Sequence, residues 1–220
     1  MFEFLIDLKS FIRSVLFCFR YLPLSLAVKV PIKLGKNVKV EKLCRGQLKF
    51  NKVFGRYQII LGDLGSPALQ CFDTTLYVDD GASIIFNGFA IIAEGTSIRA
   101  DHLSVIEFGD NFYCNKNCYF RSSNRIKFGD NNLLGWNITM NTTDGHSVYI
   151  NGVLKQNSGP ILIGDNVWVS SFCVLGKGVE IADGCVISQG SIVTKKISSC
   201  HTLVGGVPAK VISYNVDWKR

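Results

Sequence analysis

The sequence predicts an all-β fold in which short strands wind into a parallel β-helix. Two observations lead to this prediction. The tetrapeptides FGDN at Phe108, FGDN at Phe128 and IGDN at Ile163 are near copies of one another, and from Ile163 onward an aliphatic residue recurs every six positions. A period of six fits neither an α-helix nor a simple strand alternation, but it suits a short strand plus a turn with one inward side chain per unit. The aliphatic column consists of Ile163, Val169, Leu175, Ile181, Ile187 and Val193.

Stacking explains how such units would form a stable domain. Three units make a coil of 18 residues, and stacked coils bury the aliphatic column while backbone N–H and C=O groups pair with the coil above or below. The same phase returns at Phe86, Phe108 and Phe128, which are 22 and 20 residues apart and indicate coils with small bulges. The Asn and Gly residues of the GDN repeats are expected at corners, where positive φ is needed. We expect the β-helix to occupy residues 31–212, with irregular early coils.

Residues 1–30 are predicted to form an amphipathic helical segment. Apolar residues recur at three- and four-residue steps from Leu5 to Phe19, and Pro23 and Pro31 close the pattern. Charged residues interrupt every apolar run well short of the ~18 residues that a membrane span needs. Two interpretations remain open for this helix. It packs on its own domain or on a neighbouring subunit, or it lies in a membrane interface with Phe and Leu on one side and Lys and Arg on the other.

The repeat is interrupted between Met140 and Ile163, where 23 residues stand in place of one six-residue step. We expect an inserted, protruding loop over residues 141–162, because long loops within regular solenoids are usually functional or disordered. This loop carries His146, and a neutral imidazole suits the role of general base near pH 7. Asp144 is a candidate to orient its ring. The alternative is a solvent-exposed loop histidine without a catalytic role. His102 and His201 are expected to be structural or surface residues.

Composition narrows the class of protein. The chain has 220 residues, 47% of them hydrophobic, which predicts one main globular unit. Its eight cysteines lack paired zinc-ligand spacing, so we predict no metal site and expect buried thiols in a reducing cytoplasm. No cleavable signal peptide is evident. A net charge of +7 and a pI near 9.0 favour an acidic partner, but no nucleic-acid-binding motif is present, and we expect no nucleic-acid partner.

The C-terminal part of the chain resembles a known family. The segment IGDNVWVSSFCVLGKGVEIADGCVISQGSIVTKKISSCHTLVGGVPAKVI, residues 163–212, resembles the last coils of the hexapeptide-repeat acyltransferases, especially the maltose and galactoside acetyltransferases and the capsule O-acetyltransferases. The resemblance is specific over residues 108–212, diffuse over 32–104 and absent from the N-terminal helix. It implies a left-handed β-helix, a homotrimer, acetyl-CoA as donor and active sites in clefts between neighbouring β-helices. Residues 213–220 would form a C-terminal tail.

The same resemblance implies roles for individual residues. His146 precedes IGDNVWV as the catalytic histidine of the sugar acetyltransferases precedes its IGDNVWIG strand, and Trp168 matches the tryptophan of that motif, which lies at the cleft. Ser170 stands where the motif usually has Gly. Direct attack on the thioester is expected, with the oxyanion stabilised by backbone N–H groups near Ser170 or by the Trp168 indole. The residues expected to bind acetyl-CoA are Gly190 and Ser191 along the pantetheine arm, Thr194, Lys195 and Lys210 toward the nucleotide, and Lys177 on the preceding coil.

The expected function is therefore acetyl transfer from acetyl-CoA to a hydroxyl of a carbohydrate, such as a surface or capsular polysaccharide or its precursor. Such an enzyme would be cytoplasmic, with membrane association if the N-terminal helix contacts lipid. Two alternatives stay open. One is N-acetylation of an amino sugar or acylation of another small alcohol. The other is a non-catalytic β-helix scaffold, which would retain the aliphatic column without needing the loop histidine.

Overall fold

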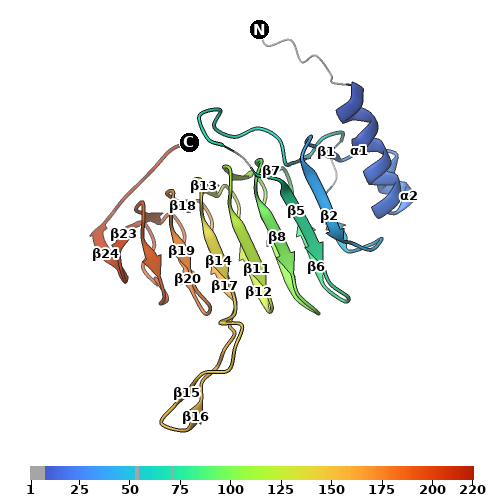
Figure 1. Ribbon diagram of the computed structural model, residues 1–220. Helices are drawn as coiled ribbons and strands as arrows, with labels where there is room; N and C mark the ends of the chain where they lie inside the picture. The colour runs from blue at the N-terminus through green and yellow to red at the C-terminus, as the bar shows by residue number, and fades with distance from the viewer. Residues whose placement is uncertain (1–7, 53–54, 71) are drawn as a thin grey trace.

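The computed structural model describes residues 8–52, 55–70 and 72–220, and it is a parallel β-helix capped by helices at its N-terminal end (Figure 1). Strands in sequence order fall on three faces in turn, so that each face is one sheet of the prism. Face 1 holds nine strands, face 2 seven and face 3 six. Face 1 consists of β1 (Ile32–Leu34), β4 (Ile59–Leu61), β7 (Ala90–Ile92), β10 (Phe112–Cys114), β13 (Leu133–Leu134), β18 (Trp168–Val169), β21 (Val186–Ile187), β23 (Thr202–Gly206) and β24 (Ala209–Tyr214). Face 2 consists of β2 (Val38–Lys42), β5 (Thr74–Val78), β8 (Ser97–Ala100), β11 (Tyr119–Ser122), β14 (Thr139–Asn141), β19 (Val174–Leu175) and β22 (Ile192–Val193). Face 3 consists of β3 (Leu48–Phe50), β6 (Ser83–Phe86), β9 (Val105–Phe108), β12 (Arg125–Phe128), β17 (Ile161–Ile163) and β20 (Glu180–Ile181).

The core is the inward-facing column that the six-residue period predicts. Val169, Leu175, Ile187 and Val193 have no exposed surface, and Ile163 and Ile181 retain only 4% and 3%. In the earlier coils Phe86, Phe108 and Phe128 stack along face 3, with ring centroids 5.4 and 5.5 Å apart. The predicted core register is therefore confirmed. Strand β24 departs from the pattern because it turns back and pairs antiparallel with β23.

The GDN repeats form one corner of the prism, between faces 3 and 1. The three asparagines adopt φ of 55°, 60° and 53° at Asn111, Asn131 and Asn166, as expected for corners. The preceding aspartates explain the repeat, because each carboxylate accepts a backbone N–H from the coil before it: Asp110 N donates to Asp130 and Asp130 N to Asp165, both at 2.7 Å. The repeated tetrapeptide thus joins neighbouring coils as well as turning the chain.

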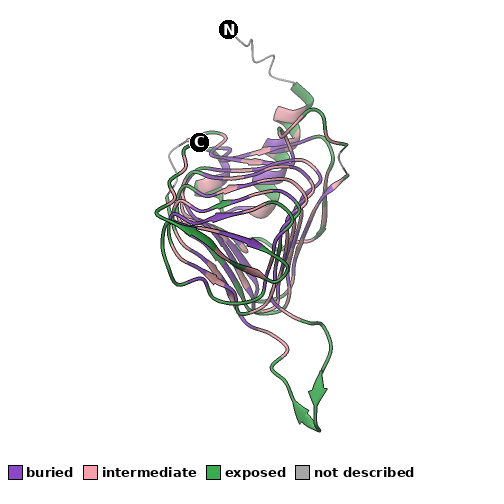
Figure 2. Cartoon of the chain, turned by 90° about the vertical axis from the view of Figure 1, so that its left-hand side faces the viewer, coloured by how far each residue is buried: buried purple, intermediate pink, exposed green. Residues whose placement is uncertain are grey.

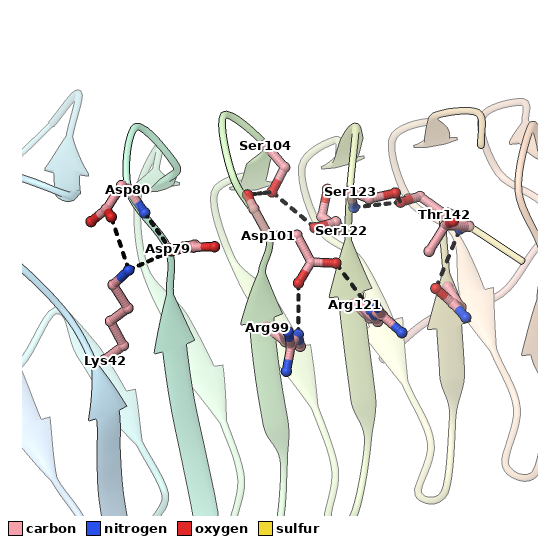
Figure 3. Close-up of polar contacts among 12 residues, drawn as sticks. Lys42, Asp79, Asp80, Arg99, Asp101, Ser104, Arg121, Ser122, Ser123 and Thr142 are labelled. Carbon is pink, nitrogen blue, oxygen red and sulfur yellow. Dashed lines mark hydrogen bonds and ion pairs between the residues drawn. The ribbon is translucent and has the colours of Figure 1, made fainter. Parts of the chain in front are cut away.

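Polar side chains also join coils along face 2 and the corner that follows it (Figure 3). Arg99 and Arg121, on adjacent strands β8 and β11, both donate to Asp101, at 2.6 and 3.0 Å. Further along, Ser123 N donates to Oγ1 of the buried Thr142 at 2.8 Å. The Ser123–Thr142 contact lies where the chain leaves the β-helix, after Asn141.

The N-terminal segment forms two helices, α1 (Leu8–Tyr21) and α2 (Leu24–Ala27). The predicted helical segment begins at residue 1, and its residues 1–7 lie outside the described part of the chain. The helix ends before Pro23 because a proline ring disfavours helical geometry at the residue that precedes it. Phe17, Cys18 and Leu22 are buried against the first coil, and α1 packs on β1.

The inserted loop leaves the β-helix at the corner between faces 2 and 3 (Figure 2). Asn141 still pairs with Arg121 in β14, and Ile161 already pairs with Ile126 in β17, so the loop itself spans residues 142–160 within the predicted interval. It projects far from the prism as an antiparallel hairpin of β15 (Tyr149–Ile150) and β16 (Val153–Leu154).

Candidate active site

His146 lies exposed near the base of the loop. Below it, Thr143 and Ser158 form an antiparallel bridge, and Asp144 N donates to Asn157 O at 2.8 Å, so the two arms of the loop are joined at this level. Asp144, the candidate to orient the histidine, instead pairs with Lys177 through its carboxylate. The position of His146 is therefore set by the backbone of the loop and not by a contact with Asp144.

Lys177 holds the loop against the β-helix. It comes from the turn between β19 and β20, the same corner one coil further on, and its Nζ donates to the Asp144 carboxylate and, at 2.6 Å, to Gln156 O. One lysine thus contacts both arms of the loop. Lys177 is predicted from the sequence to bind the donor, and in the structure its Nζ is engaged by the two arms of the loop.

Replacing Lys177 with methionine should loosen the loop. Partly exposed ion pairs contribute about 0.2–1 kcal/mol, so cleavage of the hairpin by chymotrypsin, which cuts beside Tyr149 and Leu154, should accelerate up to about fivefold. Lys127→Met, which removes an exposed lysine from β12, provides the matched control and should leave the rate unchanged. Equal cleavage rates for wild type and Lys177→Met would show that the pair does not restrain the loop.

Trp168 lies on face 1, in a cleft of about 260 Å³. The ring is 37% exposed, and Tyr113, Trp136, Ser170 and Gln189 also line the cleft. Burial raises the pKa of the Tyr113 hydroxyl. Ser170, which stands where the resembling motif has glycine, is one of the residues that line this cleft.

The C-terminal tail packs beside two residues of the cleft, Trp168 and Tyr113. Trp218 lies with its ring centroid 6.0 Å from that of Trp168, and its indole donates to Asn166 O at 2.8 Å. The Arg220 guanidinium lies 4.8 Å from the centroid of the Tyr113 ring. The tail thus returns across face 1 to earlier coils, a placement that sequence reasoning missed.

Asn115 also lines the cleft, and the sequence did not single it out. Its Oδ1 accepts the backbone N–H groups of Ser66 and Lys116, at 3.0 and 2.9 Å. Within the described residues its amide N–H groups donate to no protein acceptor, so they are available to a ligand. By contrast, the backbone N–H groups of Trp168 and Ser170 donate to Cys185 O and Ile187 O of the next coil. This pairing occupies the N–H groups of Trp168 and Ser170 themselves, whereas the Trp168 indole N–H has no protein acceptor among the described residues.

The residues expected to bind acetyl-CoA fall into separate groups. Thr194 and Lys195 are exposed where β22 ends, at the same corner as Lys177 and the loop. Gly190 adjoins the cleft residue Gln189, at the corner between faces 1 and 2, and a side chain added there would meet no neighbour within 4 Å. Lys210 is exposed on β24.

Ser191 has few hydrogen-bonding groups available to a ligand. It has no exposed surface, its hydroxyl and N–H both donate to Ser188 O, and its C=O accepts from Val174 N. Burial and these contacts argue against the predicted role of Ser191 along the pantetheine arm.

Comparison with known proteins identifies the family. Residues 160–195 match the family described as bacterial transferase hexapeptide (six repeats). The chain is 38% identical over 143 residues to the galactoside O-acetyltransferase of Escherichia coli K12, covering 61% of this chain and 68% of that protein. The chain belongs to the hexapeptide-repeat transferase family. It spans about half the length of other curated relatives, such as a putative acetyltransferase of Schizosaccharomyces pombe, to which it is 38% identical over 49% of this chain and 52% of the relative.

Two solved acetyltransferase structures share the fold. The polySia-specific acetyltransferase NeuO matches 86% of this chain and 82% of its own with a TM-score of 0.54 and 20% identity. A hexapeptide-repeat acetyltransferase from Vibrio cholerae O1 biovar eltor, complexed with acetyl coenzyme A, matches 61% and 72% with a TM-score of 0.50 and 23% identity. The expectation of a left-handed parallel β-helix is confirmed.

In this hexapeptide-repeat transferase the two halves of the candidate site lie on opposite sides of one prism. The loop with His146 leaves the prism at one corner (Figure 2), between β14 of face 2 and β17 of face 3, whereas Trp168 is in β18 of face 1, which that corner does not adjoin. A single chain therefore does not bring His146 and Trp168 together. Residues 8–52, 55–70 and 72–220 contain no cluster of three His, Cys, Asp or Glu side chains that could hold a metal ion.

Proposed function

We propose that this protein is an O-acetyltransferase that moves acetyl from acetyl-CoA to a carbohydrate hydroxyl, with active sites formed between the subunits of a homotrimer. The observation that carries the proposal is the separation of the His146 loop from the Trp168 cleft. A loop that projects away from its own prism can meet a cleft on face 1 only if the cleft belongs to a neighbouring chain. The galactoside acetyltransferase relative supports a sugar acceptor.

In the proposed reaction, neutral His146 accepts the proton of the acceptor hydroxyl as its oxygen attacks the thioester carbonyl carbon. The amide N–H of Asn115 and the indole N–H of Trp168 donate to the oxyanion of the tetrahedral intermediate. Collapse breaks the C–S bond, and the CoA thiolate takes up the proton from the imidazolium. Burial raises the pKa of the Cys118 and Cys173 thiols, which disfavours the thiolate that an acetyl-cysteine route would need.

The donor would extend from the cleft past Gly190, where the absence of a side chain leaves room for the pantetheine arm. The proposed contacts with the nucleotide phosphates are Lys210, Thr194 and Lys195. In the trimer each of these residues would come from the subunit that places it beside the cleft. Lys196 is a poorer candidate because it pairs with Glu180.

The test is transfer of radiolabelled acetyl from acetyl-CoA to a panel of neutral and acidic mono-, oligo- and polysaccharides. We expect label in a product that mild alkali releases, as an ester requires. A label that survives alkali would identify an amide and favour amino-sugar N-acetylation. Failure to transfer to any acceptor, together with no binding of CoA in a calorimetric titration, would leave a non-catalytic scaffold.

A further inference from the structure

The outer side of the N-terminal helices carries an exposed apolar stripe. Four residues of α1 recur on one side, with exposed fractions from 42% to 67%, and two residues of α2 and its end extend the stripe with more than half of their surface exposed. At about 100° per residue the four α1 positions fall within an arc of about 80°. The stripe consists of Leu8, Ile12, Leu16 and Phe19, followed by Leu24 and Val28.

The β-helix does not require this stripe. The opposite side of α1 already covers the first coil: Phe17 and Cys18 are buried, and Ser14 Oγ donates to Ser10 O at 2.7 Å and accepts Leu34 N at 2.9 Å. Caps of solenoid proteins ordinarily present a polar outer surface. An apolar outer surface on this cap therefore indicates a partner.

Charge indicates the kind of partner. Residues 8–40 contain seven Lys or Arg and no Asp or Glu. Lys9, Arg13 and Arg20 follow the stripe along one border, within about 60° of it around the helix. Arg20 and Lys29 are exposed beside it. A hydrophobic strip bordered by cations matches the boundary between acyl chains and anionic head groups, where apolar side chains enter and cations meet phosphate.

The position of the helices is compatible with such contact. They lie at the N-terminal end of the prism, whereas the loop and strands β10, β13 and β18, which carry residues of the cleft, lie further along it (Figure 1). None of the helices within residues 8–52, 55–70 and 72–220 could span a bilayer.

We propose that α1 and α2 dock this protein on an anionic phospholipid surface, with the stripe buried at the lipid boundary and the neighbouring Lys and Arg paired with lipid phosphates. This goes beyond the proposed acetyl transfer and does not depend on it. Docking would place the prism end-on at a membrane and keep the loop and cleft open to an acceptor.

Flotation of the full-length protein with vesicles tests the proposal. We expect wild type to float with vesicles of equal parts phosphatidylcholine and phosphatidylglycerol, less with phosphatidylcholine alone, and less again at high salt. Leu16→Glu should weaken partitioning about tenfold or more. Arg20→Gln and Lys29→Gln should each weaken binding to the anionic vesicles about fivefold.

Matched variants separate this proposal from other causes. Leu103→Glu changes a residue of similar exposure, 69% against 64% for Leu16, in a turn of the β-helix, and it should bind vesicles as wild type does. Absence of wild-type flotation, or an equal loss in Leu103→Glu, would overturn the proposal. So would a lower molar mass of Leu16→Glu in light scattering without lipid, because that result would assign the stripe to contact between subunits.

Discussion

Replacement of His146 with alanine is expected to lower kcat for acetyl transfer by about 10²–10⁴-fold, the range that a positioned general base contributes. The KM for acetyl-CoA should change little, because the proposed donor contacts lie elsewhere, at Gly190 and Lys210. The measurement is initial-rate kinetics with the best acceptor of the carbohydrate panel. His102→Ala is the matched control, since His102 is exposed in a turn of an earlier coil and should retain the wild-type rate.

A mixture of two inactive variants tests whether the site lies between subunits. His146→Ala and Asn115→Ala change opposite sides of the prism, so a mixed trimer contains some interfaces that pair an intact loop with an intact cleft. Random assembly of equal amounts restores about a quarter of the sites. Co-expression should therefore recover activity that neither variant shows alone. Absence of recovery in mixed trimers would mean that both residues act within one chain, or that one of them does not act in catalysis.

The core was predictable from the sequence because its cause is local and repeated. Each coil must place an aliphatic or aromatic side chain inward at every sixth residue, so Val169, Leu175 and Ile187 could be assigned to the interior without knowledge of their neighbours. The corner asparagines followed from the same period. The break at Met140 was equally visible, because an insertion interrupts a regular count.

The cleft was less predictable because its contacts join residues far apart in sequence. Asn115 acquires its orientation from Ser66, 49 positions earlier, and Trp218 donates to Asn166 from 52 positions later. Because asparagines are also common at the corners of this β-helix, an asparagine with a different role is hard to recognise from the sequence. Asn117 needs its positive φ of 60°, whereas Asn115 is not among the residues with positive φ.

Removal of the Phe108 side chain is expected to cause the largest loss of stability in the chain. Phe108 has no exposed surface and contacts four other rings, stacked with Phe86 and Phe128 and tilted or edge-on to Phe112 and Phe120. Phe108→Ala should lower the free energy of unfolding by about 3–5 kcal/mol, because the surrounding coils close the cavity only in part. Denaturation in guanidinium at one protein concentration provides the measurement. Phe72→Ala, which changes a ring that is 73% exposed, should shift stability by less than about 0.5 kcal/mol.

The position of Phe108 also predicts how the variant unfolds. In a solenoid each coil contacts only its neighbours, so a weakened interface in the middle uncouples the two ends. All three tryptophans, Trp136, Trp168 and Trp218, follow Phe108 in the chain, so their fluorescence reports the C-terminal coils, whereas far-ultraviolet circular dichroism reports every coil. The two signals should coincide in wild type and separate in Phe108→Ala, with dichroism falling first as the N-terminal coils unfold. Coincident transitions in the variant would show that the remaining Phe contacts suffice to couple the coils.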